Sequence, residues 1–114
     1  AIVSRSSTMG SANIIGHGTV LNADVRIGDN NLINTHAILE HHSQIANDCH
    51  IAPGAVICGA ANIESLVFLG ANSVVLPNKS VARTFTLGAG SVLTKNIIKK
   101  SLTYAGVPAK ELKT

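Results

Sequence analysis

The stretch INTHAI-LEHHSQ-IANDCH-IAPGAV, residues 33–56, consists of four consecutive units of six residues, and each unit begins with an aliphatic side chain. The same spacing continues in both directions without an insertion, from Val3 to Leu93. The repeated positions are Val3, Met9, Ile15, Leu21, Ile27, Ile33, Leu39, Ile45, Ile51, Ile57, Ile63, Leu69, Val75, Val81, Leu87 and Leu93. A period of six is neither the 3.6 of an α-helix nor the 2 of a single strand, and it is typical of a parallel β-helix.

The period predicts how each unit is built. Side chains alternate along a strand, so the repeated aliphatic residue and the residue two before it point inward, while the residue between them points outward. The three residues that follow form a corner, where Gly, Ala, Asn and Asp are frequent. Three units close one triangular coil, so residues 18 apart stack on one another. We therefore predict an all-β protein, with a parallel β-helix of about five coils over residues 1–96.

A C-terminal cap is predicted over residues 97–114, where the repeat stops. We expect Leu102, Tyr104 and Leu112 to cover the open end of the prism. A short helix is expected near residues 109–113.

The outward-facing residues sort into three columns, and one column is entirely aliphatic. Its members are Val20, Ile38, Val56, Val74 and Val92. Exposed aliphatic patches mark interfaces, and cyclic closure buries one repeated face. We predict a homotrimer in which this face lines the three-fold axis. The alternative is a lateral contact between this face and a further domain.

In such a trimer, the two edges of the aliphatic face meet the opposite edges of the neighbouring subunits. One edge carries His41 and Gly59, and the other carries Ala71 and Ala89. The small residues at 59, 71 and 89 leave backbone amides open. We therefore expect a groove between subunits in which a long, thin ligand lies parallel to the prism axis.

His41 is the leading candidate for a catalytic base. Imidazole titrates near neutral pH, and His41 is stacked against Gly59, which has no side chain to block it. A metal site is the alternative, because His36 of one subunit can approach His41 of the next. That arrangement resembles gamma-class carbonic anhydrases, but Arg5 and Ala23 occupy the positions where a third His is needed. A β-helix that trimerises without catalysis is the other alternative.

The composition excludes several classes of function. The net charge is a mild +3 and only 3% of residues are aromatic, with no Trp, so stacking platforms for single-stranded nucleic acid are absent. No apolar run approaches the roughly 20 residues of a membrane span. Cys49 and Cys58 are interpreted as small core residues of a reducing compartment, which favours a cytoplasmic protein. The chain begins within the repeat, and we expect its true N-terminus to lie further upstream.

Several motifs resemble the hexapeptide-repeat acyltransferases, which are left-handed β-helices. The more specific of them is Glu40-His41-His42 followed by His50-Ile51-Ala52-Pro53-Gly54, which is similar to the bacterial sialic acid O-acetyltransferases and UDP-4-amino-sugar (bacillosamine) N-acetyltransferases. Similar stretches lie at residues 68–77, 87–92 and 106–110. The resemblance covers nearly the whole chain.

The resemblance implies acetyl transfer from acetyl-CoA to an amino or hydroxyl group of a sugar, with a nucleotide sugar as substrate and no metal. It implies that His41 is the general base, that His50 contacts acetyl-CoA, and that Ala71 and Ala89 bind the cofactor through backbone groups. The backbone near Gly59 is expected to hold the oxyanion.

Two departures from the family pattern stand out. Family members often carry Glu or Asp directly after the base, where this chain has His42, so either His42 or Glu40 must support His41. Family members also carry a small N-terminal α/β domain for the nucleotide sugar. We therefore interpret the chain as the acetyltransferase half of a longer protein.

Overall fold

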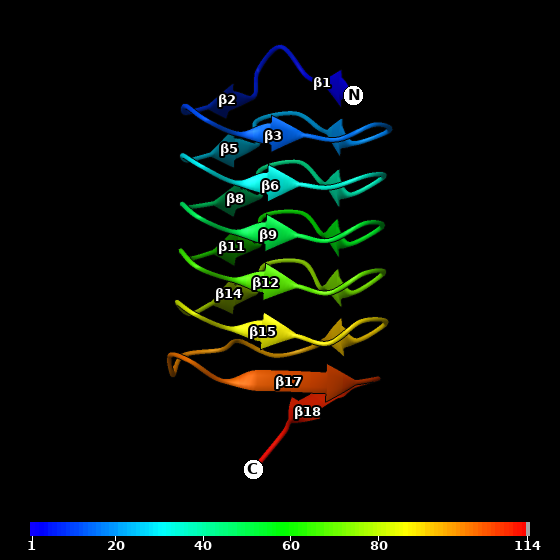
Figure 1. The fold of residues 1–114 in the computed structure, drawn as a ribbon, viewed down its shortest axis with the longest axis vertical. Coiled ribbons are helices and arrows are strands. Elements are labelled where there is room, and N and C mark those ends of the chain that lie inside the picture. Colours follow the sequence, from blue (N-terminus) through cyan, green and yellow to red (C-terminus); the bar gives the residue numbers. More distant parts are fainter. Residues whose placement is uncertain (114) are drawn as a thin grey trace.

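The computed structural model describes residues 1–113, and these residues form eighteen strands and no helix. The chain winds upon itself in triangular coils stacked along one long axis, with the N-terminus at one end and the C-terminus at the other (Figure 1). The principal extents are 41 × 21 × 21 Å. The predicted all-β parallel β-helix is confirmed.

Each coil contributes one short strand to each of three parallel sheets. The first sheet, called sheet A, forms the aliphatic face and contains β1 (Ile2–Val3), β4 (Val20–Leu21), β7 (Ile38–Leu39), β10 (Val56–Ile57), β13 (Val74–Val75) and β16 (Val92–Leu93). Sheet B forms the polar face and contains β2 (Thr8–Met9), β5 (Arg26–Ile27), β8 (Gln44–Ile45), β11 (Asn62–Ile63) and β14 (Ser80–Val81). Sheet C contains β3 (Ile14–Ile15), β6 (Leu32–Ile33), β9 (His50–Ile51), β12 (Phe68–Leu69), β15 (Thr86–Leu87), β17 (Thr103–Gly106) and β18 (Ala109–Glu111).

The register of the strands follows the 18-residue coil. Val56 pairs with Ile38 on one side and with Val74 on the other, and the same offset holds through β16 in sheet A. Residues 18 apart are therefore stacked, as the period predicts.

The corners are made by residues with a left-handed backbone. Every sixth residue from Ala12 to Gly90 has a positive φ, between 56° and 73°. Asn, Asp and Gly occupy most of these positions, because they tolerate this conformation best. His36 and His42 occupy two of them, with φ values of 60° and 62°.

The repeated aliphatic residues form the core. From Leu21 to Leu93 each of them is buried, with at most 5% of its surface exposed. The core is less complete at the N-terminal end, where Val3 and Met9 are 43% and 42% exposed.

The C-terminal segment differs from the prediction in two respects. Residues 109–111 form strand β18, which pairs antiparallel with β17, and not a helix. Leu112 is 55% exposed and does not cover the core, whereas Leu102 and Tyr104 pack against it beside the buried Ile97 and Ala109. The antiparallel hairpin satisfies backbone groups that a short isolated helix would leave without partners.

The C-terminal segment also adds a partial coil to the β-helix. Ile97 forms a parallel bridge with Val81, and β17 pairs parallel with β15. The helix therefore has about six turns, where about five were predicted, because a shortened coil follows the last regular hexad. Of the predicted cap over residues 97–114, Thr114 lies outside the described residues.

Candidate active site

The histidine edge is the corner that joins sheet A to sheet B, and it carries His41 and His42. Both follow the buried Leu39 at the end of β7, so the coil directs them outward into solvent. The left-handed backbone at His42 turns the chain toward β8 and sets the two imidazoles beside each other.

Gly59 provides the space that the His41 ring occupies. A Cβ atom at position 59 would lie 2.9 Å from both Nε2 and Cε1 of His41. The Ala60 amide donates a hydrogen bond to the His41 carbonyl at 3.0 Å, which holds the two coils in this register. The stacking of His41 against Gly59 that the sequence predicts is thus present.

His42, and not Glu40, contacts the candidate base. The Nδ1 atoms of His41 and His42 are 3.1 Å apart, and the two rings meet edge to face at 83°. The Nε2 atom of His42 lies 3.3 Å from Oδ2 of Asp24, one coil away. Across residues 1–113 no hydrogen bond or ion pair joins the Glu40 carboxylate to either histidine. Which of the two residues supports His41 was left open by the sequence, and the geometry favours His42.

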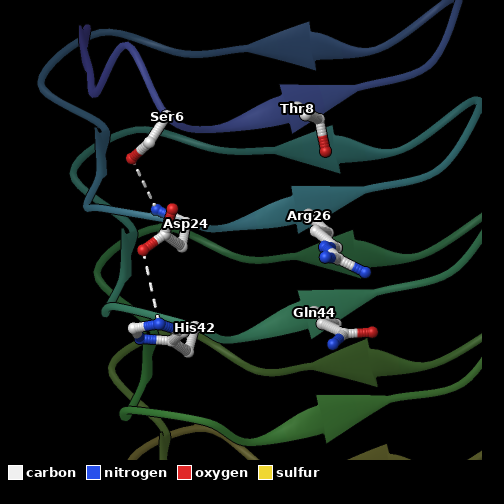
Figure 2. A pocket seen from close by; sticks show the side chains of 6 residues that line it. All are labelled: Ser6, Thr8, Asp24, Arg26, His42 and Gln44. Atoms are coloured by element: carbon white, nitrogen blue, oxygen red, sulfur yellow. Dashed lines mark hydrogen bonds and ion pairs between the residues drawn. The ribbon is translucent and has the colours of Figure 1, made fainter.

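A hollow of 360 Å³ opens on the polar face beside this edge. Figure 2 shows Ser6, Asp24 and His42 above one another on successive coils, with a second column of polar side chains on the adjacent strands. The lining residues are Ser6, Thr8, Asp24, Arg26, His42 and Gln44. The sequence analysis missed Asp24, although its place 18 residues before His42 was a usable signal.

The alanine edge is the corner that joins sheet C to sheet A, and it carries Ala71 and Ala89. Within the described chain, the backbone amides of both residues have no hydrogen-bond partner. The absence of a side chain at Gly70 leaves the Ala89 amide uncovered, because a Cβ at position 70 would lie 2.6 Å from the Ala89 nitrogen. Two open amides on one edge form a suitable place for carbonyl or phosphate oxygens of a ligand.

His50 lies on sheet C, between the two edges. Its ring stacks edge to face on Phe68, with centroids 5.0 Å apart. Its Nε2 atom is buried and has no hydrogen-bond partner in residues 1–113.

The predicted site residues therefore separate into two groups. His41 and Gly59 lie together on the histidine edge, whereas Ala71 and Ala89 lie on the alanine edge at the other side of sheet A. One chain does not bring these two groups together.

The two cysteines have little thiolate character. Burial raises the pKa of the Cys49 thiol. Burial and the nearby negative charge of Glu40 raise the pKa of Cys58. Both thiols are free, which fits the interpretation of small packing residues.

Among the residues that the structure describes, no three His, Cys, Asp or Glu side chains of one chain gather as metal ligands would. No helix in the same residues is long and apolar enough to cross a membrane.

Comparison with known proteins confirms the resemblance to hexapeptide-repeat sugar acetyltransferases. Residues 24–59 match the family described as bacterial transferase hexapeptide (six repeats), whose repeats form a left-handed β-helix. The bifunctional protein GlmU of Azoarcus sp. (strain BH72) is 31% identical over 89% of this chain.

Two solved structures show similar coils. A mutant of perosamine N-acetyltransferase from Caulobacter crescentus, in complex with CoA and GDP-perosamine, has a TM-score of 0.81 and 28% identity over 98% of this chain. The acetyltransferase domain of PglB from Neisseria gonorrhoeae, in complex with acetyl coenzyme A, has a TM-score of 0.77 and 29% identity over 96%. The chain spans 27% of the GlmU sequence and 56% of each of these two solved chains.

Proposed function

We propose that this chain transfers an acetyl group from acetyl-CoA to the amino group of a nucleotide-linked sugar, with His41 as general base. The observation that carries the proposal is the His41 imidazole, which projects into space that a side chain at Gly59 would fill. The similar proteins support the substrate class, since one was solved with CoA and GDP-perosamine and another with acetyl coenzyme A.

In the proposed reaction the sugar amine attacks the thioester carbonyl carbon. His41 Nε2 accepts the proton that the amine loses, the carbon–sulfur bond breaks, and the CoA thiolate leaves. A positioned base contributes roughly 10²–10⁴-fold, and the fixed orientation of the two substrates in a groove adds more. The backbone amide of Gly59 has no partner within residues 1–113 and is our candidate donor to the developing oxyanion.

The active site is proposed to form between subunits of a homotrimer. The aliphatic column of sheet A is half-buried in a single chain, and packing it around a three-fold axis removes it from water. The same packing sets the histidine edge of one subunit against the alanine edge of the next. Acetyl-CoA would then contact the open amides of Ala71 and Ala89 and the His50 ring of that second subunit.

The first test is calorimetric titration of acetyl-CoA into the metal-free protein, with the mass of the assembly measured on the same sample. We expect one binding site per subunit of a trimer. A folded trimer that does not bind acetyl-CoA would contradict the proposal and favour a non-catalytic or zinc-binding β-helix.

The second test is the release of CoA thiol with a panel of nucleotide-linked amino sugars, GDP-perosamine among them. His41→Ala should lower kcat by roughly 10²–10⁴-fold with nearly unchanged acetyl-CoA affinity. Arg83→Ala is the matched control, because Arg83 has the same position in its hexad on the edge between sheets B and C. Normal turnover by His41→Ala would disprove the assignment of the base.

A further inference from the structure

Asp24, His42 and His41 form a continuous chain of polar contacts on the histidine edge. The Asp24 carboxylate lies 3.3 Å from His42 Nε2, and His42 Nδ1 lies 3.1 Å from His41 Nδ1. Ser6 holds the backbone at Asp24, because its hydroxyl accepts a hydrogen bond from the Asp24 backbone amide at 2.9 Å. Figure 2 shows the Ser6, Asp24 and His42 side chains aligned across three coils.

The coil period brings these residues together. Asp24 and His42 are 18 residues apart and occupy the same corner position, with φ values of 60° and 62°. The His42 amide donates to the Ala23 carbonyl at 3.0 Å, which locks the two corners in register. The stacking of the two corners is therefore set by the backbone, and the side-chain rotamers bring Oδ2 of Asp24 to 3.3 Å from His42 Nε2.

When both rings are neutral, the contacts favour one position for the proton on each ring. A carboxylate only accepts hydrogen bonds, so the 3.3 Å approach of Asp24 Oδ2 to Nε2 favours a proton on His42 Nε2. The neutral His42 ring then has an acceptor at Nδ1, and His41 must donate to it from Nδ1. His41 Nε2 is left with a free lone pair, and this is the atom that lies against Gly59.

Resting on the proposed function, we infer that Asp24 and His42 are positioning residues that act on the base through a two-imidazole relay. Asp24 orients His42, and His42 holds His41 in the tautomer that accepts a proton at Nε2. When His41 takes the proton from the sugar amine, the new positive charge is shared with His42 through the Nδ1–Nδ1 hydrogen bond. Asp24 thus supplies from the preceding coil the carboxylate that the family resemblance implies directly after the base.

Stability is a poor explanation for this arrangement. The His42 and Asp24 side chains are 62% and 50% exposed, and exposed ion pairs contribute little to folding. Variants at these positions should therefore fold, and changes in turnover can be assigned to the relay.

The test is a double-mutant cycle that combines Asp24→Asn with His42→Asp. Asp24→Asn should lower kcat by roughly ten- to a hundredfold with unchanged KM for acetyl-CoA, because an amide can donate to His42 and reverse its tautomer. His42→Asp places the carboxylate directly after His41, where the family resemblance implies one. In this background Asp24→Asn should change kcat by less than about twofold, because the relay is no longer needed.

The backbone permits the rescue variant. Asp24 and Asp48 already occupy this corner position with φ values of 60° and 59°, so Asp at position 42 introduces no new strain. Asp48→Asn is the matched control, being the same change at an equivalent corner on the edge between sheets B and C. Equal kcat values for Asp24→Asn and Asp48→Asn would overturn the inference. So would a loss of kcat on Asp24→Asn that is as large in the His42→Asp background as in the native protein.

A second readout is independent of catalysis. Ring ¹H–¹⁵N spectra of ¹⁵N-histidine-labelled protein, assigned with a His41→Gln variant, report which nitrogen of His41 is protonated. We expect the Nδ1–H tautomer in the native protein and a shift toward Nε2–H in Asp24→Asn. A native protein with His41 mainly in the Nε2–H form would refute the relay. A different result, full turnover by His41→Ala, would contradict the proposed function.

Discussion

The histidine edge and the alanine edge flank the same sheet and share one backbone geometry, yet they offer a ligand different chemistry. The histidine edge presents the His41 and His42 imidazoles beside the side-chain-free Gly59. The alanine edge presents the amides of Ala71 and Ala89, which have no hydrogen-bond partner among residues 1–113. A repeating backbone thus sets the positions, and the side chains at each corner decide what that corner can do.

Gly59 and Gly70 differ in what an added side chain would meet. At position 59, an added Cβ would meet the tip of the His41 side chain, whereas at position 70 it would meet backbone atoms of residues 87–89. A side-chain tip can move aside, but the backbone of a stacked coil cannot. Gly59 therefore matters for the position of the His41 ring, and Gly70 for the packing of the coils.

The largest expected effect comes from separating the histidine edge of one subunit from the alanine edge of its neighbour in the proposed trimer. Val56→Asp places a charge in the middle of the aliphatic column, where a trimer would bury three copies without partners. We expect a monomer by light scattering and loss of acetyl transfer, with the secondary structure retained because Val56 points outward. Asn62→Asp, at the same register on the polar face of sheet B, is the control and should stay trimeric. An active trimer of Val56→Asp would show that the edges do not meet across sheet A.

The paired changes Gly70→Ala and Gly59→Ala test the two glycine roles. Gly70→Ala should lower the free energy of unfolding by about 1–3 kcal/mol, because overpacking against backbone is not relieved by a rotamer change. Gly59→Ala should unfold nearly as the native protein does in a denaturant titration but lose roughly tenfold or more in kcat, because the His41 ring is displaced. Equal losses of stability in the two variants would contradict this distinction.

The smallest effect concerns Cys58, which lies beside Gly59 on the histidine edge. Its raised pKa leaves less thiolate at neutral pH, so iodoacetamide should modify it more slowly than a cysteine peptide. Glu40→Gln removes a nearby negative charge that contributes to the shift, and modification should become faster at the same pH. A rate that exceeds the peptide rate in the native protein would argue for an activated thiol.

Much of the site could be predicted from residue spacing, because a coil of constant length turns sequence distance into stacking. The contact of His41 with Gly59 follows from their offset of 18 residues, and the position of Ala71 and Ala89 on another edge follows from the offset of 12 between residues 59 and 71. The shared corner position of Asp24 and His42 follows from the same offset, but the contact between their side chains does not, and Asp24 is not a neighbour of His41 in the sequence. The C-terminal segment could not be predicted in this way, since the period ends there and local propensity favoured a helix where pairing with β17 prevails.

The sequence by itself determined the parallel β-helix, its three faces and the corners that carry the candidate residues. The reason is that one hexad repeated without insertion leaves a single way to bury every aliphatic side chain. Only the tertiary structure decided that His42 contacts His41, that Asp24 contacts His42, and that the last strands form a hairpin. Those outcomes depend on rotamers and on pairing between distant backbone groups, which the repeat does not specify.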